Sequence, residues 1–172
     1  MAGHIQTAKN TVWRNPQSII ELVKEFFGGI IELDPCASDN VEKHFALHNL
    51  YLANEDDGLT AQWRELKTYC NPPYTRTIKQ KWIRKAFAST AEVLMLIPAT
   101  PGSRIWQEIV LPNAQICFVK GRIRFELDGE ESAGAPMDCA IVGFHIKDIS
   151  KFKDVFSTIG TVLTTPSPDY EL

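Results

Sequence analysis

The chain has 172 residues, 44% hydrophobic and 23% charged, which is enough for one well-filled core, so we expect a single domain over residues 1–172 with residues 165–172 as a loose tail. The net charge of −3 excludes an overall basic field, so any contact with nucleic acid has to come from a local patch. No apolar run reaches membrane-spanning length and the first residues lack a signal pattern, so we expect a cytoplasmic protein with no membrane contact.

The predicted elements of the first half are a helix over residues 15–27, a strand over residues 30–35, a short helix within residues 58–66 and a strand over residues 67–70. Asn15 suits the N-cap of the first helix and Pro16 its first helical position. We expect Pro35 to end the first strand, because proline cannot donate to a sheet ladder. Residues 38–52 show no clear pattern and stay unassigned.

The predicted elements of the second half are a helix over residues 79–89, strands over residues 91–98 and 115–120, a helix around residues 104–110, an extended segment over residues 122–125 and a last strand over residues 138–144. The first of these helices places Trp82, Ile83, Ala86 and Phe87 on one face. Because strands alternate with helices and then cluster near the end, we predict an α/β fold with a mostly parallel sheet and antiparallel C-terminal strands.

The segment Asn71-Pro72-Pro73-Tyr74 directly follows a predicted strand. The two prolines end that strand and stiffen the chain, which leaves the Asn71 side-chain oxygen and the Pro72 carbonyl free to accept hydrogen bonds. Two such acceptors suit the amino group of a planar base, because they draw both hydrogens out of the ring plane and release the nitrogen lone pair. The Tyr74 ring can stack on the base, which is worth about 1–3 kcal/mol.

Asp34 and Asn71 both come at the ends of predicted strands, so we expect them to line one crevice at the carboxyl ends of the sheet. A carboxylate there can meet an ammonium group or ribose hydroxyls. Asp57 and Leu59 could hold an adenine ring by one hydrogen bond and one apolar contact. If the donor is a sulfonium methyl group, no strong base is needed, and alignment of the two reactants can remove roughly 7–11 kcal/mol of barrier.

Six motifs follow one another along the chain: WRNP at residues 13–16, LDPCA at 33–37, DGL followed by Trp63 at 57–63, CNPPY at 70–74, LIPA at 96–99 and KGRIRF at 120–125. In this order they resemble the phage-type DNA adenine methyltransferase family. The resemblance implies a reduced Rossmann-like methyltransferase fold, S-adenosylmethionine as cofactor, double-stranded DNA as partner and no metal. It also implies a phage or prophage setting and a role in restriction–modification or anti-restriction.

The resemblance assigns roles to individual residues. It implies that Asn71, Pro72, Pro73 and Tyr74 hold the target adenine. The cofactor would be bound by the residues of the first three motifs, which are Trp13, Asn15, Pro16, Asp34, Pro35, Cys36, Asp57 and Leu59. In this sequence Cys36-Ala37-Ser38 replaces the glycine-rich turn of larger methyltransferases.

Two basic sets are candidates for DNA contact. Arg76 and Lys79 follow the predicted base corner, and Lys120, Arg122 and Arg124 alternate along one side of an expected hairpin. Both suit phosphate groups, and both also fit an ordinary wet helix face or sheet edge. The widely spaced cysteines, Cys36, Cys70, Cys117 and Cys139, indicate reduced core residues and neither metal ligands nor disulfides.

The leading hypothesis is an enzyme that flips an adenine out of duplex DNA and methylates its exocyclic amine. The same acceptor pair suits a protein glutamine or an RNA base, although enzymes of that kind generally carry a glycine-rich cofactor loop. A third alternative is a non-catalytic DNA-binding decoy that kept the fold without binding the cofactor. The target sequence and the oligomeric state stay open.

Overall fold

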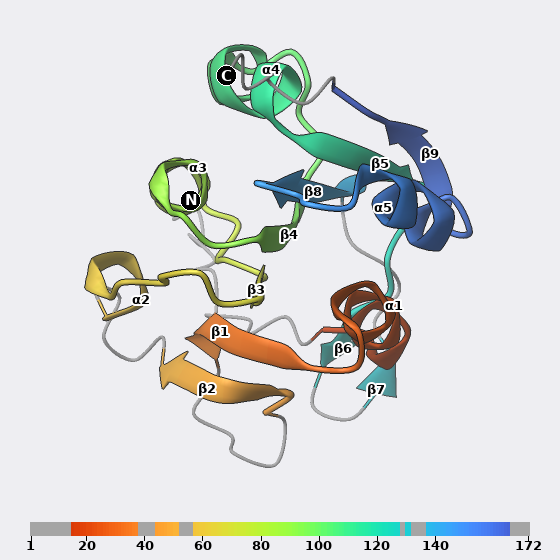
Figure 1. The fold of residues 1–172 in the computed structure, drawn as a ribbon. Helices are drawn as coiled ribbons and strands as arrows, with labels where there is room; N and C mark the ends of the chain where they lie inside the picture. The colour runs from red at the N-terminus through yellow and green to blue at the C-terminus, as the bar shows by residue number, and fades with distance from the viewer. Residues whose placement is uncertain (1–14, 38–43, 52–56, 128–129, 132–136, 166–172) are drawn as a thin grey trace, which may run out of the picture.

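The computed structural model describes residues 15–37, 44–51, 57–127, 130–131 and 137–165 (Figure 1). The elements, in chain order, are α1 (Gln17–Phe27), β1 (Ile31–Ala37), β2 (Ala46–Tyr51), α2 (Asp57–Thr60), β3 (Thr68–Cys70), α3 (Arg76–Ala88), β4 (Val93–Pro98), the π-helical turn η2 (Trp106–Val110), α4 (Leu111–Asn113), β5 (Gln115–Val119), β6 (Glu126–Leu127), β7 (Glu130–Glu131), β8 (Cys139–Phe144), α5 (Ile149–Phe156) and β9 (Gly160–Leu163).

A seven-stranded sheet in the order β2-β1-β3-β4-β8-β5-β9 forms the centre of the molecule, and β6 and β7 pair separately. The strands from β2 to β4 are parallel, whereas β8 is antiparallel to both β4 and β5, and β9 is antiparallel to β5. The predicted α/β, Rossmann-like arrangement with antiparallel C-terminal strands is therefore confirmed. The carboxyl ends of β1, β3, β4 and β5 all meet at one edge, which we call the carboxyl edge.

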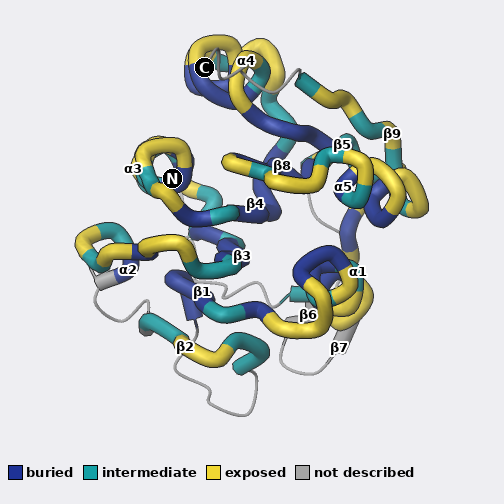
Figure 2. Tube along the Cα trace, viewed as in Figure 1, coloured by how far each residue is buried: buried dark blue, intermediate teal, exposed yellow. Residues whose placement is uncertain are grey.

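Helices cover both faces of the sheet: α1 and α5 lie on one face, and α2, α3 and α4 on the other (Figure 1). All six residues of β4 are buried because this central strand is covered on both sides (Figure 2). The core on the α1 side contains Val23, Phe26 and Phe152. The other core contains Trp63, Trp82 and Trp106.

Two predictions at the start of the chain are wrong. Pro16, and not Asn15, is the N-cap of α1, and the helix has no side-chain cap, because Oδ1 of Asn15 accepts a hydrogen bond from the Tyr69 hydroxyl. Strand β1 does not stop at Pro35 but continues to Ala37. The pairing of β1 with β2 shifts register between Asp34 and Ala37, where a residue without an N–H can be accommodated.

Helix α3 begins at Arg76, three residues before the predicted start, because the carbonyl of Thr75 already accepts from the Lys79 N–H (2.9 Å). Phe87 is 37% exposed, so it does not share the buried face of Trp82 and Ile83. Its ring instead stacks on that of His145, with 6.5 Å between centroids.

The expected hairpin through Arg122 and Arg124 is also wrong. Residues 122–125 have no regular secondary structure, and the short pair of β6 with β7 follows them. The alternation is real, since Ile123 and Phe125 are buried while both arginines are exposed, but it belongs to an irregular segment lying over the core.

The chain forms more structure at its end than the sequence predicted. Helix α5 and strand β9 follow β8, which is therefore not the last strand. Thr165, the only described residue of the expected tail, donates its N–H to Oε1 of Gln115 (3.1 Å). Within the described segments every helix is too short or too polar to cross a membrane, and no three His, Cys, Asp or Glu side chains gather as metal ligands.

Candidate active site

The segment Asn71-Pro72-Pro73-Tyr74, which we call the corner, leaves the sheet at the carboxyl edge. It follows β3, whose three residues are fully buried, and leads within a few residues into α3. Pro72 is buried, whereas Asn71, Pro73 and Tyr74 are partly exposed. Among the described residues no group donates a hydrogen bond to the Pro72 carbonyl. The corner therefore presents one free backbone acceptor beside the Asn71 carboxamide.

Tyr74 folds back onto Asn71. Its hydroxyl donates to Oδ1 of Asn71 (2.9 Å) and lies 3.4 Å from the Leu96 carbonyl oxygen. Its ring packs edge-to-face against Phe125, with 6.0 Å between centroids and 74° between planes. Burial raises the pKa of Tyr74 well above its usual value, so the phenol stays protonated and remains a donor.

Asp34 lies within β1 and not after it, and its side chain is only 5% exposed. Its Oδ1 accepts from the Cys36 N–H (2.9 Å), and no cation pairs with it among the described residues. Burial raises the pKa of Asp34 from 3.8 to about 7, although the Cys36 hydrogen bond lowers it. Near neutral pH this carboxyl group is consequently poised to ionise when a cation arrives.

Asn49 on β2 lies beside Asp34, a neighbour that the sequence did not reveal. It is the register partner of Asp34, so both side chains leave the same face of the sheet. Nδ2 of Asn49 donates to the Ala46 carbonyl (2.8 Å), but Oδ1 is buried with no partner among the described residues. A buried unpaired acceptor is costly, which suggests that a ligand supplies the missing donor.

The hydrogen bond from Tyr69 to Asn15 (2.8 Å) ties the start of α1 to β3. Tyr69 is fully buried on the α1 side, and burial, together with the nearby Asp34 carboxyl, raises its pKa well above the usual value. Asn15 and Pro16 are thus held at the α1 side of the carboxyl edge. Trp13, the other residue expected there, lies outside the described residues.

A pair of thiols underlies the site. Sγ of Cys36 and Sγ of Cys70 lie 3.0 Å apart and join β1 to β3 just before the corner. Burial raises the pKa of both groups, so they stay protonated. All four cysteines are free and buried, as the sequence predicted.

Helix α2 starts at Asp57, whose side chain lies outside the described residues. Gly58 sits tightly against the sheet, since a Cβ atom there would collide with the Pro35 carbonyl oxygen and the Trp82 ring. Leu59 is partly buried and packs against the core on the α2 and α3 side. The structure therefore places Leu59 on the opposite face of the sheet from Tyr69.

The basic residues occupy different environments. Arg76 is exposed at the first turn of α3, but Lys79 is only 8% exposed, and burial together with the Arg76 charge lowers its pKa. Lys79 therefore lies on the inner side of α3, and not on the exposed face that phosphate contact or the alternative of a wet helix face would require. Lys120, Arg122 and Arg124 are all exposed near the carboxyl edge.

The local pattern thus identified the corner, while the contacts of Asn49, Tyr69 and Phe125 come from distant parts of the chain.

Compared with known proteins, residues 2–161 match the family model described as DNA N-6-adenine-methyltransferase (Dam). No curated protein matches the chain. The family acts on adenine in DNA and generally depends on S-adenosylmethionine. Since the match covers nearly the whole sequence, this chain belongs to the DNA N-6-adenine-methyltransferase family.

Proposed function

We propose that this chain is a site-specific DNA methyltransferase that flips its target adenine out of the duplex and transfers a methyl group from S-adenosylmethionine to the N6 amine. The observation that carries the proposal is the corner, where the Asn71 carboxamide, the free Pro72 carbonyl and the Tyr74 ring lie together at the carboxyl edge. Membership of the family supports adenine in DNA as the substrate.

The two oxygens of the corner would activate the amine. The adenine amino nitrogen is a poor nucleophile because its lone pair is delocalised into the ring. Oδ1 of Asn71 and the Pro72 carbonyl would accept its two hydrogens, make the nitrogen pyramidal and direct its lone pair away from the acceptors. Both acceptors are neutral, and the amine loses its proton only after the methyl group is attached, so the corner needs no strong base.

The residues around Asp34 fit the polar groups of S-adenosylmethionine, which supplies an electrophilic methyl group when bound. A buried carboxylate without a cation suits an ammonium group, and the unpaired Oδ1 of Asn49 would accept a further donor. Pro35 and Cys36 continue the same strand. Asn15 and Pro16, with Trp13 before them, would border the methionine end.

The adenine ring of the cofactor would lie nearer α2. Leu59 is partly buried and would offer this ring an apolar contact. Asp57, at the start of α2, would accept a hydrogen bond from its amino group.

The target base would stack on Tyr74 after the tyrosine leaves Asn71. Stacking of about 1–3 kcal/mol offsets much of the few kcal/mol that flipping costs. Arg76 at the start of α3 would hold a phosphate beside the flipped base. Lys79 would contact a phosphate only if its amino group extended beyond the inner face of α3.

Two substitutions at one position test the corner. Asn71→Ala removes the side-chain acceptor and should lower kcat for DNA by about 100-fold or more, because the amine would stay planar. Asn71→Asp keeps an acceptor oxygen at this position and should retain most of the activity. Methyl transfer from radiolabelled S-adenosylmethionine to duplex DNA measures both, with thermal unfolding as the check on folding. Normal turnover by Asn71→Ala would contradict the role of the corner.

The same assay separates the alternatives. Duplex DNA, RNA of the same sequence and a release-factor-like protein are offered in parallel, and we expect label in DNA alone. Label in RNA or protein would indicate an amino-methyltransferase that acts on that substrate and not on DNA. DNA binding with no S-adenosylmethionine bound at millimolar concentration in calorimetry would indicate a decoy.

A further inference from the structure

A groove of about 1050 Å³ opens on the α1 and α5 side of the molecule, beside the end of β5. Three segments form its walls: residues 16–19 at the start of α1, the chain from Phe118 at the end of β5 to Arg124, and residues 157–161 in the turn between α5 and β9. None of the four corner residues lines the groove, and among its described lining residues Pro16 alone also belongs to the proposed cofactor site.

The charge of this groove differs from that of the whole protein. Lys120, Arg122 and Arg124 line it, and its described lining residues include no carboxylate, although the chain as a whole carries a net charge of −3. Lys120 and Arg122 are exposed. With Lys120 and Arg122 exposed and no carboxylate among its described lining residues, the groove attracts an anion locally even on an acidic protein.

The start of α1 adds to this field. The helix is 11 residues long, and its N-cap Pro16 has no side-chain acceptor, so the N–H groups of Gln17 and Ser18 have no partner among the described residues. Both residues line the groove. The positive end of the helix therefore supplements the three side-chain cations.

One short segment, residues 122–125, connects the groove to the corner. Ile123 is buried and lines the groove, and Phe125, two residues later, is buried against the Tyr74 ring. From Arg122 to Phe125 the chain spans at most about 10 Å. This is no more than about three base steps of 3.4 Å along one DNA strand.

We propose that this groove binds the sugar-phosphate backbone of DNA a few nucleotides from the flipped adenine, with Lys120 and Arg122 contacting the phosphates. The inference rests on the proposed function for the identity of its ligand and adds a second site to it. The corner would recognise the base, and the groove would supply most of the salt-dependent affinity.

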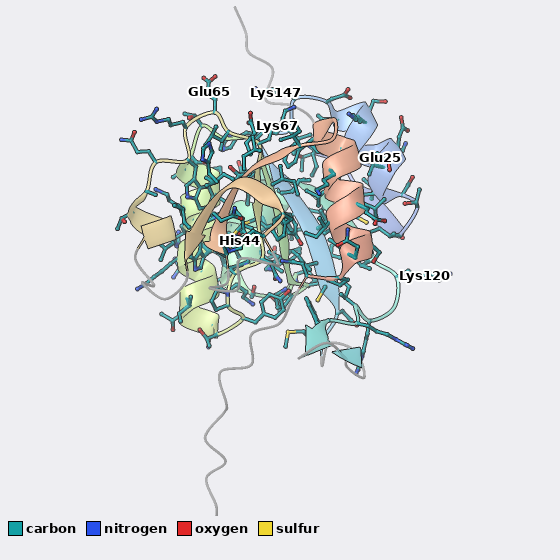
Figure 3. The ribbon with its side chains drawn as sticks, turned by 90° about the horizontal axis from the view of Figure 1, so that it is seen from below. Glu25, His44, Glu65, Lys67, Lys120 and Lys147 are labelled. Atoms are coloured by element: carbon teal, nitrogen blue, oxygen red, sulfur yellow. The ribbon has the colours of Figure 1, made fainter. Side chains whose placement is uncertain are left out.

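Lys120→Gln and Arg122→Gln test the groove, and Lys147→Gln is the matched control. Lys147 is also exposed and loses the same charge, but it lies at the end of the molecule opposite Lys120 (Figure 3). The measurement is the fluorescence anisotropy of a labelled duplex over a range of salt concentrations. Each groove variant should reduce the slope of log K against log salt by about 1, and Lys147→Gln should match the wild type.

Duplexes in which single phosphates are replaced by neutral methylphosphonates show which phosphate the groove binds. Neutralising the phosphate that Arg122 binds should weaken the wild type but have no further effect on Arg122→Gln. In turnover assays the groove variants should raise KM for DNA at least threefold and leave kcat at saturating DNA unchanged. A kcat loss without a change in KM would overturn the proposal.

The experiments distinguish an error in the groove proposal from an error in the proposed function. Wild-type methylation with unchanged salt slopes in Lys120→Gln and Arg122→Gln would overturn the groove alone. Reduced slopes in a protein that methylates no DNA would overturn the proposed function and support the groove as a phosphate site. Tighter binding of an RNA duplex of the same sequence would overturn the assignment to DNA.

Discussion

Asn71 and Tyr74 are bonded to each other at the point where the proposed mechanism needs both to bind adenine. The Tyr74 hydroxyl donates to the Asn71 oxygen that would accept from the base (2.9 Å between Oη and Oδ1). This bond has to break before the ring can stack on a base. A hydrogen bond of this kind contributes a net stabilisation of about 0.5–1.5 kcal/mol, which opposes base binding by the same amount.

Tyr74→Phe distinguishes the contribution of the hydroxyl group to base binding from that of the ring. The variant keeps the stacking surface and releases Asn71, so we expect roughly 2- to 10-fold tighter capture of the flipped base. Tyr74→Ala removes the stacking surface and should weaken capture. The fluorescence of 2-aminopurine at the target position reports on flipping in each variant. Weaker capture by Tyr74→Phe than by the wild type would show that the hydroxyl assists binding.

Asp34 predicts how stability depends on pH. Its pKa in the folded protein is about 7 because of burial, against a usual value of 3.8. The folded state therefore holds its proton while the unfolded state has lost it, and the free energy of unfolding should fall as pH rises from about 4 to 7, then level off. The fall attributable to Asp34 is at most about 4 kcal/mol. Urea unfolding across this range measures it.

Asp34→Asn is the test of that assignment, because an amide does not titrate. The variant should lose this part of the pH dependence and be more stable than the wild type at pH 8. An unchanged slope between pH 4 and 7 would mean that Asp34 is ionised in the folded protein.

The same carboxyl group links cofactor binding to pH. If Asp34 pairs with the ammonium group of S-adenosylmethionine, binding requires the ionised form, so affinity should fall as pH drops below 7. Calorimetry at pH 6 in buffers of different ionisation enthalpy should detect a proton released on binding. Equal affinities for S-adenosylmethionine at pH 6 and pH 8 would show that Asp34 does not bind the ammonium group of the cofactor.

At the scale of elements, local pattern predicted the structures that carry their own signal. Helix α1 has a wide apolar stripe, β4 is a continuous apolar run, and the two prolines of the corner restrict the backbone by themselves. Strands β2 and β9 could not be predicted in this way, because each is an edge strand with exposed residues such as Leu47 and Leu163. Their pairing depends on distant partners.

Strand β1 and helix α2 meet at a contact that fixes the cofactor side of the proposed site. Gly58→Ala would place a methyl group against the backbone oxygen of Pro35 and the Trp82 ring, so we expect destabilisation of about 1–3 kcal/mol. Gly102→Ala is the control, since a Cβ atom there meets nothing within 4 Å. Thermal unfolding compares the two, and equal stabilities would show that α2 can shift away from β1.

At the scale of the whole molecule, the sheet brings together groups that lie far apart in the sequence. Asp34 on β1 and the corner after β3 were predicted to meet, because parallel strands end at one edge. Asn49 and the contact of Phe125 with Tyr74 could not be predicted, because they depend on an unassigned strand and on the path of an irregular segment. The basic groove likewise could not be predicted, because its walls come from three segments that lie far apart in the sequence.

The central claim is that the corner presents an adenine amine to a methyl donor. The most direct test is to incubate the wild-type protein with duplex DNA and isotope-labelled S-adenosylmethionine, digest the DNA and map the label by mass spectrometry. We predict labelled N6-methyladenine at one recurring sequence. Label on cytosine, on a ring nitrogen of adenine or on no base at all would contradict the account.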